Sequence, residues 1–329
     1  MSQQVKARVL RALWSGLVSA GMTVAAAADN RSLRIAMIAP GEPNCTLSPP
    51  GLAFNQGLRD LGHDPLPFID LVCFANPADA PAVVQNVLRQ PPNLVVVWAY
   101  VNVAQRVHEA APDMPIVVVD VANPVGNGLV RSLSHPGGKI TGVANITDEL
   151  QAKRVQLLKE ALPQSRRLAV LSNPENPLQP DYLATTNAAA LAVGWEAKTY
   201  AVRTRTELAG AFAQMESEQM DALVLAPDPW FFASRSEIVE LARRHRLPAM
   251  YNHASFSEEE GLFTYTADFR AMGYRAAQYA SKILRGIAPA DLPVERPTTF
   301  EFVVNKSTAR DLGLKLDSSF LLRATRVVE

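Results

Sequence analysis

The stretch PIVVVDVANPVGNGLVRSLSHPGGKITGVANITDELQAKRVQLLKEALP, residues 115–163, decides the fold. It begins with an apolar run, Ile116 to Val119, which predicts a buried parallel strand. A loop rich in Pro, Asn and Gly follows, and a second short strand, Ile140 to Ala144, leads into a helix that Pro163 ends. The stretch therefore predicts a chain that leaves one sheet and enters a second domain.

Apolar runs of strand length alternate with longer amphipathic segments on both sides of this stretch. The further predicted strands are 34–39, 67–72, 94–99, 168–171, 196–200, 222–225, 249–251, 263–265 and 300–304. The predicted helices include 51–61, 80–89, 181–193, 235–244 and 269–285. Such alternation indicates parallel sheets covered by helices, so the expected class is α/β with doubly wound lobes.

An internal echo predicts two lobes of similar build. Three segments recur in the same order in both halves: 34–44 with 167–177, 92–100 with 220–229, and 113–123 with 246–254. Self-similarity of this kind indicates repeated structural units. The chain then consists of one α/β lobe up to about Val143 and another from about Ala144.

The central stretch also carries a resemblance to a known family. NPVGNGLVRSLSHPGGKITG (123–142), the pair Lys153-Arg154 and LLKEALP (157–163) resemble the pattern of periplasmic substrate-binding proteins of ABC transporters. The subgroup is the one similar to tryptophan/tyrosine-type binding proteins. Further matching segments are 166–177, 221–231, 245–251, 261–277 and 283–314. The chain departs from the family pattern after the third strand, where Ala99-Tyr100-Val101-Asn102 replaces a Gly-Thr-Pro-Ala-like turn.

The resemblance implies a periplasmic binding protein type I-like fold, in which two parallel-sheet lobes are joined by a multi-strand hinge. The implied crossings lie near Val143–Ile146, Thr266–Asp268 and Pro297–Glu301. Lobe 1 would then comprise residues 29–143 and about 267–299, and lobe 2 residues 144–266 and about 300–329.

The implied function is capture of a small solute, such as an amino acid, by lobe closure and its delivery to an ABC permease in the inner membrane. The protein is then a monomer and no enzyme. Two alternatives stay open: a periplasmic sensor that presents its solute to a membrane receptor, and a two-lobed α/β enzyme.

The amino terminus has the layout of a secretory signal peptide. Lys6, Arg8 and Arg11 precede a mostly apolar segment, 12–24, and small residues occupy 25–28. We expect residues 1–28 to be removed near Ala28 and the protein to reach the periplasm. The alternative, a membrane anchor, would need a longer apolar segment. The first cysteine is Cys45, so we do not expect a lipoprotein.

Two cysteines, Cys45 and Cys73, follow neighbouring predicted strands. In an oxidising compartment they are compatible with one disulfide. The alternative is a pair of buried free thiols.

Loops after the strands supply the candidate ligand-binding residues, because ligands of open parallel sheets lie beyond the carboxyl ends of the strands. Either aspartate of the set would suit an ammonium group, and the tyrosines would cover a ring or aliphatic carbons. The alternative for Asp120 and Asp228 is a turn or helix cap, and both Asn-Pro pairs are turn signals in their own right. The candidates are Asn44, Ser48, Tyr100, Asn102, Asp120, Asn123, Asn173, Asn176, Asp228 and Tyr251.

Composition and motifs argue against other classes. Lys+Arg and Asp+Glu are equal at 32 each, so no basic surface for nucleic acid is expected. The glycine motifs of dinucleotide and P-loop sites are missing, as are G-x-S-x-G and H-E-x-x-H. The five histidines have no metal-ligand spacing. We therefore expect neither cofactor nor metal.

Overall fold

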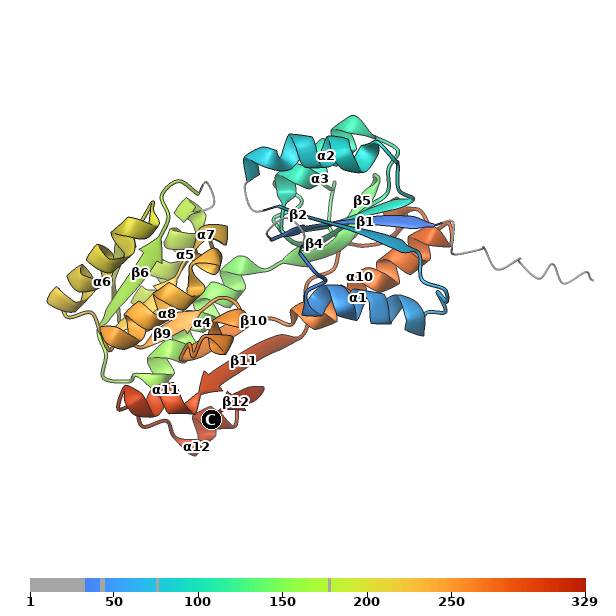
Figure 1. Ribbon diagram of the computed structural model, residues 1–329. Helices are drawn as coiled ribbons and strands as arrows, with labels where there is room; N and C mark the ends of the chain where they lie inside the picture. Colours follow the sequence, from blue (N-terminus) through green and yellow to red (C-terminus); the bar gives the residue numbers. More distant parts are fainter. Residues whose placement is uncertain (1–32, 42–44, 75–76, 177–178) are drawn as a thin grey trace, which may run out of the picture.

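The computed structural model describes residues 33–41, 45–74, 77–176 and 179–329. The predicted signal peptide, residues 1–28, and the candidate Asn44 lie outside the described residues. Two sheets with their helices form two lobes, which lie side by side and are joined by several segments of chain (Figure 1).

Lobe 1 is built on a five-stranded parallel sheet with the order β2-β1-β3-β4-β5. The central strand reads LVVVW and is buried along its whole length, because helices cover both faces of the sheet. The strands are β1 (Arg34–Pro40), β2 (Phe68–Phe74), β3 (Leu94–Trp98), β4 (Ile116–Ala122) and β5 (Ile140–Asn145).

Helices α2 (Ala80–Leu88) and α3 (Val101–Ala110) cover one face of this sheet, and α1 (Pro49–Asp60) and α10 (Phe269–Leu284) cover the other. Two glycines let α1 and α10 approach closely. A Cβ at Gly57 would lie 2.8 Å from the Ala277 Cβ, and one at Gly273 would lie 2.2 Å from the Pro50 carbonyl oxygen. A helix from late in the sequence therefore completes the core of lobe 1.

Lobe 2 is built on a seven-stranded sheet with the order β12-β11-β10-β9-β8-β6-β7. Strands β6 to β10 are parallel, but β11 pairs antiparallel with β10. The reason is connectivity: the chain reaches β11 from lobe 1, so it enters the sheet at the end where β10 leaves it. The strands are β6 (Arg167–Ser172), β7 (Glu196–Ala201), β8 (Ala222–Leu225), β9 (Ala249–Tyr251), β10 (Phe263–Ala267), β11 (Phe300–Asn305) and β12 (Arg326–Val328).

Helices α4 (Thr147–Ala161) and α5 (Gln179–Ala192) cover one face of the second sheet, and α6 (Leu208–Ser217) and α8 (Arg235–Arg244) cover the other. Shorter helices lie in the connections. They are α7 (Pro229–Ala233), α9 (Ser255–Glu258), α11 (Lys306–Asp311), α12 (Ser318–Leu321) and the 3₁₀ turns η2 (Pro77–Asp79), η3 (Arg205–Glu207) and η4 (Pro289–Asp291).

The two sheets confirm the predicted pair of doubly wound lobes. The order β7-β6-β8-β9-β10 in lobe 2 repeats the order β2-β1-β3-β4-β5 in lobe 1. Each echoed pair of segments occupies the same place in its sheet: β1 matches β6, β3 matches β8, and β4 matches β9. The antiparallel β11 and the short β12 extend only the second sheet.

Three described segments carry the chain between the lobes: β5 to α4, β10 to α10, and η4 to β11 (Figure 1). Neighbouring segments are hydrogen-bonded to one another. The amide of Ala144 donates to the Glu295 carbonyl at 2.8 Å, and the amide of Asp268 donates to the Thr299 carbonyl at 3.0 Å. A hinge of several linked segments allows the lobes to move as rigid bodies.

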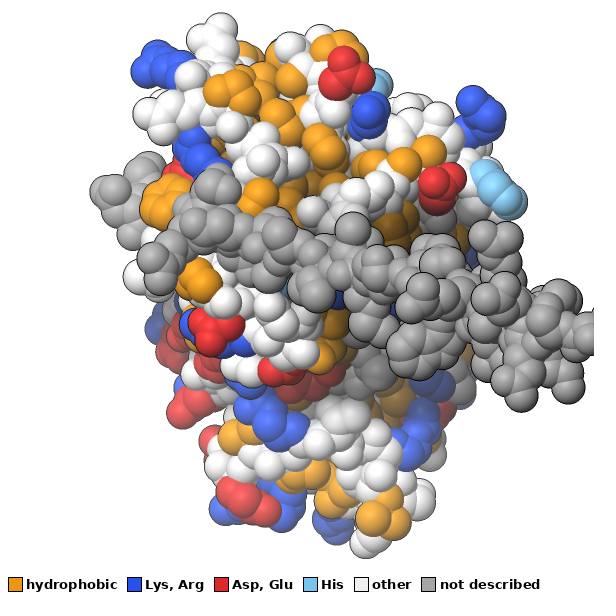
Figure 2. Space-filling view, turned by 90° about the vertical axis from the view of Figure 1, so that its right-hand side faces the viewer, with side chains coloured by type: hydrophobic (Ala, Val, Ile, Leu, Met, Phe, Trp, Pro, Cys, Tyr) orange, Lys and Arg blue, Asp and Glu red, His pale blue; other side chains and the backbone are white. Residues whose placement is uncertain are grey.

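The surface carries both signs of charge. On the face in Figure 2, acidic and basic side chains are interspersed among hydrophobic ones, and neither sign gathers into a patch among the described side chains visible there. Within the described ranges, none of the helices combines the length and the apolar character that crossing a bilayer requires.

Candidate ligand-binding site

The carboxyl ends of the parallel strands of both sheets point toward the hinge. Strand β5 of lobe 1 leads directly into α4 of lobe 2, and β10 of lobe 2 leads directly into α10 of lobe 1. The loops that follow the strands of one lobe therefore face those of the other. This is the edge at which open α/β sheets bind ligands.

Asp120 lies at this edge of lobe 1 in a backbone distortion. The pairing of β4 with β5 shifts register between Val119 and Val121, and Asp120 between them has a φ of 60°. Non-glycine residues adopt this conformation at a cost of about 1–3 kcal/mol, and such residues and bulges are concentrated near functional sites. The bulge turns the carboxylate toward the next strand, where the Asn145 side-chain amide donates to Oδ1 at 2.5 Å.

Asp120 has an unusual protonation equilibrium. Burial raises the pKa of its carboxyl to about 7, while the hydrogen bond from Asn145 and the charge of Arg154 act in the opposite direction. Among the described residues, Asp120 forms no ion pair within 4.0 Å. The carboxyl is thus held without a counter-charge in direct contact.

Arg154 supplies the opposite charge from α4 of lobe 2. It is 3% exposed, and its Nε donates to the Tyr265 carbonyl at 2.7 Å while Nη1 donates to Gln151 Oε1 at 3.4 Å. It too is absent from the ion pairs of the described part of the chain. Burial lowers the pKa of its guanidinium, which a nearby anion would counteract.

A buried polar network holds Arg154 in place. The Tyr182 hydroxyl contacts both Gln151 Oε1 and the Leu225 carbonyl, the latter at 2.9 Å, and Gln151 Nε2 donates to Thr186 Oγ1 at 2.9 Å. Such satisfied networks rigidify the groups that they support. Arg154 and Asp120 are therefore two buried groups of opposite charge type, one from each lobe, that interact electrostatically without an ion-pair contact among the described residues.

Three predicted residues meet at the same edge of lobe 2. The side-chain amides of Asn173 and Asn176 donate to Asp228 Oδ2 at 3.0 and 2.9 Å, and the amide of Trp230 donates to Oδ1 at 2.8 Å. Asp228 is therefore the N-cap of α7, which is the cap role that the sequence left open. Its carboxylate oxygens are used within lobe 2, so it shapes the loop.

The two predicted tyrosines pack inside their own lobes. Tyr100 is 7% exposed, stacks on Phe74 with 4.6 Å between ring centroids, and donates to the Phe74 carbonyl at 3.3 Å. Burial raises its pKa to about 12. Tyr251 is 1% exposed and stacks on Phe256 at 4.6 Å. The structure does not bring these rings to the Asp120–Arg154 site, so we leave both out of it.

The remaining described candidates follow strands of lobe 1. Ser48 is exposed at the N-cap of α1, and Asn102 is partly buried in the first turn of α3. Asn123 has a φ of 42°, and its Oδ1 accepts from the Gly126 amide at 3.0 Å. Asn123 thus builds a turn, as its Asn-Pro pairing suggested. All three lie at the edge of the sheet where Asp120 lies.

An aromatic cluster that the sequence did not reveal lies near Arg154. The His253 ring stacks on Phe269, the first residue of α10, at 5.0 Å and meets Phe232 edge-on at 4.7 Å. His253 Nδ1 accepts from the Ser255 amide at 3.1 Å. Burial and the charges of Arg235 and Arg154 lower its pKa to about 4, so the ring is neutral near pH 7. The cluster joins lobe 2 to the start of α10.

The predicted cysteines form a disulfide at the same edge of lobe 1. Cys73 lies in β2 beside Ala39 of β1, Cys45 follows β1, and their Cα atoms are 6.1 Å apart. Of the two alternatives that the sequence left open, the structure has the bridge. It ties the segment before α1 to the neighbouring strand.

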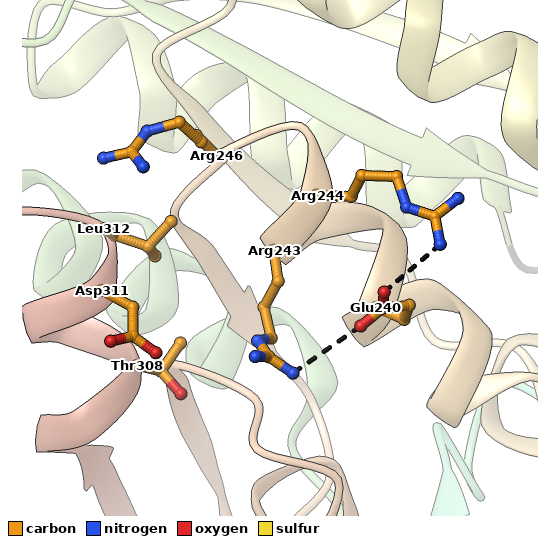
Figure 3. Close-up of a pocket in the computed structure, with 7 residues that line it drawn as sticks. All are labelled: Glu240, Arg243, Arg244, Arg246, Thr308, Asp311 and Leu312. Atoms are coloured by element: carbon orange, nitrogen blue, oxygen red, sulfur yellow. Dashed lines mark hydrogen bonds and ion pairs between the residues drawn. The ribbon is translucent and has the colours of Figure 1, made fainter.

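A pocket with a cavity volume of about 260 Å³ lies in lobe 2, at the end opposite the hinge (Figure 3). Its charged groups pair mostly with one another: Glu240 contacts Arg243 at 3.6 Å and Arg244 at 3.3 Å, and Arg243 also contacts Glu260 at 2.7 Å. The pocket is formed by the end of α8 and by α11, which lie away from the hinge. It is not part of the candidate site.

A protein-family model matches the chain. The model described as ABC transporter substrate binding protein matches residues 53–328, which is most of the chain. A curated relative, the tyrosine-binding protein of Clostridioides difficile (strain R20291), is 24% identical over 213 residues, 64% of this chain. The match spans 61% of that relative's length.

Solved structures share the fold at low sequence identity. The ABC domain in complex with L-Trp from Streptococcus pneumonia superposes with a TM-score of 0.79 at 24% identity, over 90% of this chain and 99% of that one. A conserved domain protein of Vibrio cholerae gives 0.77 at 24% identity, over 90% and 100% of the two chains. A ligand-free, open substrate-binding protein of Clostridium difficile gives 0.69 at 20% identity, over 90% and 99%.

Proposed function

Because the chain belongs to the ABC transporter substrate-binding protein family, with the two-lobed fold of type I periplasmic binding proteins, we propose that it captures an amino acid between its lobes and delivers it to a membrane permease. One observation carries the choice of ligand class. Asp120 of lobe 1 and Arg154 of lobe 2 are opposite charges at the facing edges of the lobes, and neither has an ion-pair partner among the described residues.

The proposed mechanism is binding and closure, with no covalent step. The ligand ammonium group lies against Asp120, and the ligand carboxylate accepts the hydrogen bonds that the Arg154 fork still has to offer. A molecule that touches both lobes favours the closed arrangement over the open one, because only the closed form makes both sets of contacts. The linked hinge segments carry this movement while each core stays intact.

The relatives support an amino-acid ligand. One is named a tyrosine-binding protein, and one solved structure holds L-Trp. We infer that the site in this chain takes the same zwitterionic head group. We also infer export to the periplasm, supported by the charged, apolar and small-residue layout of residues 1–28, and action as a monomer.

A thermal-shift screen of the purified protein against the common amino acids tests the proposal. A ligand present at about 100 times its Kd adds about 2.7 kcal/mol to the free energy of unfolding, which raises the unfolding temperature measurably. We expect at least one amino acid to do this and to be recovered unchanged. A flat response to every amino acid contradicts the proposed ligand class, and conversion of a bound one contradicts the proposed mechanism.

We expect the affinity for an amino acid to rise about tenfold between pH 6 and pH 8. In the free protein the Asp120 pKa is about 7, so the carboxyl is mostly neutral at pH 6 and mostly ionised at pH 8. Pairing with an ammonium group requires the ionised form, so binding below pH 7 must release a proton. His253, whose pKa is about 4, stays neutral throughout this range.

Isothermal titration in two buffers of different ionisation enthalpy measures the released proton directly. Asp120→Asn should bind weakly with no pH dependence between pH 6 and pH 8. Asp113→Asn is the matched control, because the Asp113 side chain is fully exposed before β4, at the far edge of the sheet. An unaltered pH profile in Asp120→Asn would contradict the assignment.

A further inference from the structure

A small recess lies in lobe 1 at the edge that faces lobe 2. We call it the β1–β3 recess. Its walls are Met37 of β1, Leu71 of β2, Trp98 at the end of β3, Leu47 from the segment before α1, and the Cys45–Cys73 disulfide. The strand register brings these residues together: Met37 lies beside Leu71, and Ala39 lies beside Cys73.

The recess is close in the sheet to the charged part of the site. Trp98, which forms one wall, pairs in register with Val119 on the neighbouring strand β4. Asp120 follows Val119 directly. If the ammonium group of a ligand contacts Asp120 on β4, the recess therefore begins on the next strand of the same sheet, at Trp98 of β3.

The lining of the recess is mostly apolar and includes two hydroxyl groups. The hydroxyls belong to Thr46 and Ser48, and none of the described residues that line the recess is charged. Trp98 is 7% exposed, so little of its ring is open to water. Sulfur, indole and aliphatic groups make up most of the walls and therefore favour an apolar occupant, while a charged group would find no opposite charge there.

The size of the recess limits what enters it. Its cavity volume is about 50 Å³. A cavity of about 150 Å³ accepts a benzene molecule, whereas one water-sized group needs about 10–15 Å³. The recess therefore has room for about three or four groups of methyl size, which is an isopropyl or isobutyl side chain. A phenol or indole ring is too large.

Two contacts fix the walls of the recess and prevent it from expanding around a larger side chain. The disulfide fixes Cys45, two residues before Leu47, to β2. On the other side Leu47 packs over Gly51 of α1, where an added Cβ would lie 2.8 Å from its Cδ2. Rigid supports of this kind give a binding site its selectivity for shape.

We propose that the β1–β3 recess is the side-chain subsite of the ligand and that it selects an amino acid with a small branched aliphatic side chain over one with an aromatic ring. The inference rests on the proposed function, because the head group must lie at Asp120 and Arg154. It gives this chain a different ligand preference from the relatives named for tyrosine and crystallised with L-Trp.

Calorimetric titration of the unmodified protein tests the preference first and needs no variant. The probes are L-alanine, L-valine, L-leucine and L-tryptophan. Each buried methylene is expected to improve Kd about fourfold, so L-valine or L-leucine should bind at least tenfold more tightly than L-alanine. L-Tryptophan should bind at least tenfold more weakly than the better of the two.

Leu47→Ala then tests the wall. Removing this side chain enlarges the recess, so the ratio of the L-tryptophan Kd to the L-leucine Kd should fall at least tenfold. Leu52→Ala is the matched control, because Leu52 lies in the first turn of α1 but is 58% exposed and outside the recess. Its ratio should equal that of the unmodified protein. Leu47→Val, a milder change, should shift the ratio in the same direction if Leu47→Ala fails to fold.

The outcomes separate the two proposals. Tight L-tryptophan binding by the unmodified protein, or a Leu47 variant with an unchanged ratio, overturns the aliphatic subsite and leaves the proposed function standing. Failure of every amino acid to bind overturns the proposed function, and the subsite falls with it. The expected preference together with its relaxation in the Leu47 variant supports both.

Discussion

Arg154→Met is expected to abolish measurable amino-acid binding at ligand concentrations that saturate the unmodified protein. Removing one partner of a buried, hydrogen-bonded charge pair costs about 2–5 kcal/mol, which is about 30-fold to several thousand-fold in Kd. The upper part of this range applies, because Arg154 is 3% exposed and the ligand carboxylate would lose its fork of donors.

The same substitution should also lower the stability of the free protein. The Tyr265 carbonyl would lose the hydrogen bond that Arg154 Nε donates at 2.7 Å, and Gln151 Oε1 would lose one of its donors. A buried acceptor left without a partner costs about 1–3 kcal/mol. Urea unfolding measures this change separately from binding, so a loss of affinity in folded protein can be recognised as such.

Lys153→Met is the control for Arg154→Met. Lys153 is the preceding residue on α4, and its Nζ donates to Gln156 Oε1 at 3.0 Å on the exposed side of the helix. The Lys153→Met variant should bind the ligand with the same Kd as the unmodified protein. Arg154→Lys keeps the charge but not the planar fork, so it should recover only part of the affinity. Unchanged Kd in folded Arg154→Met would remove Arg154 from the site.

The sheets could be predicted from the sequence because parallel strands buried on both faces are continuous apolar runs. LVVVW at 94–98 and IVVV at 116–119 contain little else, and the turn residues between such runs are distinctive. The echo between halves predicted two lobes of similar build, and the shared strand order is in line with it. The antiparallel β11 could not be read in this way, because its direction depends on the lobe from which the chain arrives.

The candidate site was predicted less well, because the sequence specifies which loop a residue occupies but not where its side chain points. Tyr100 lies at the expected edge. However, Ala99 before it has a φ of 61°, and the Tyr100 amide donates to the Trp98 carbonyl at 2.7 Å. This tight turn directs the ring onto Phe74, into the core of lobe 1.

Arg154 was not among the candidate site residues predicted from the sequence, for a related reason. Its place in α4 beside Lys153 suggests two surface cations in a helix of mixed polarity. Only the docking of α4 against β10 buries it, and its main partner, the Tyr265 carbonyl, is 111 residues away in the sequence. Asp120, by contrast, was a candidate from the sequence because it directly follows an apolar run, although the bulge that orients its side chain was not predicted.

The disulfide is expected to make a large contribution to the free energy of unfolding, and this contribution can be tested. Cys45 and Cys73 are 28 residues apart, and between them lie α1 and most of β2. In the chain-entropy account, closing a loop of this length stabilises the native state by about 3–4 kcal/mol, because it removes conformations from the unfolded chain. That is a large fraction of the net stability of an ordinary domain.

The double variant Cys45→Ser/Cys73→Ser should therefore lose about 3–4 kcal/mol in free energy of unfolding relative to the oxidised protein. Urea unfolding, with the slope of the transition compared between proteins, measures this loss. A dithiol reductant should destabilise the unmodified protein by a similar amount and leave the double variant unaffected, which separates the lost cross-link from the effect of serine itself. If the double variant unfolds within about 0.5 kcal/mol of the oxidised protein, the change is no larger than that of an ordinary surface substitution. The bridge would then hold the recess wall in place without stabilising the lobe.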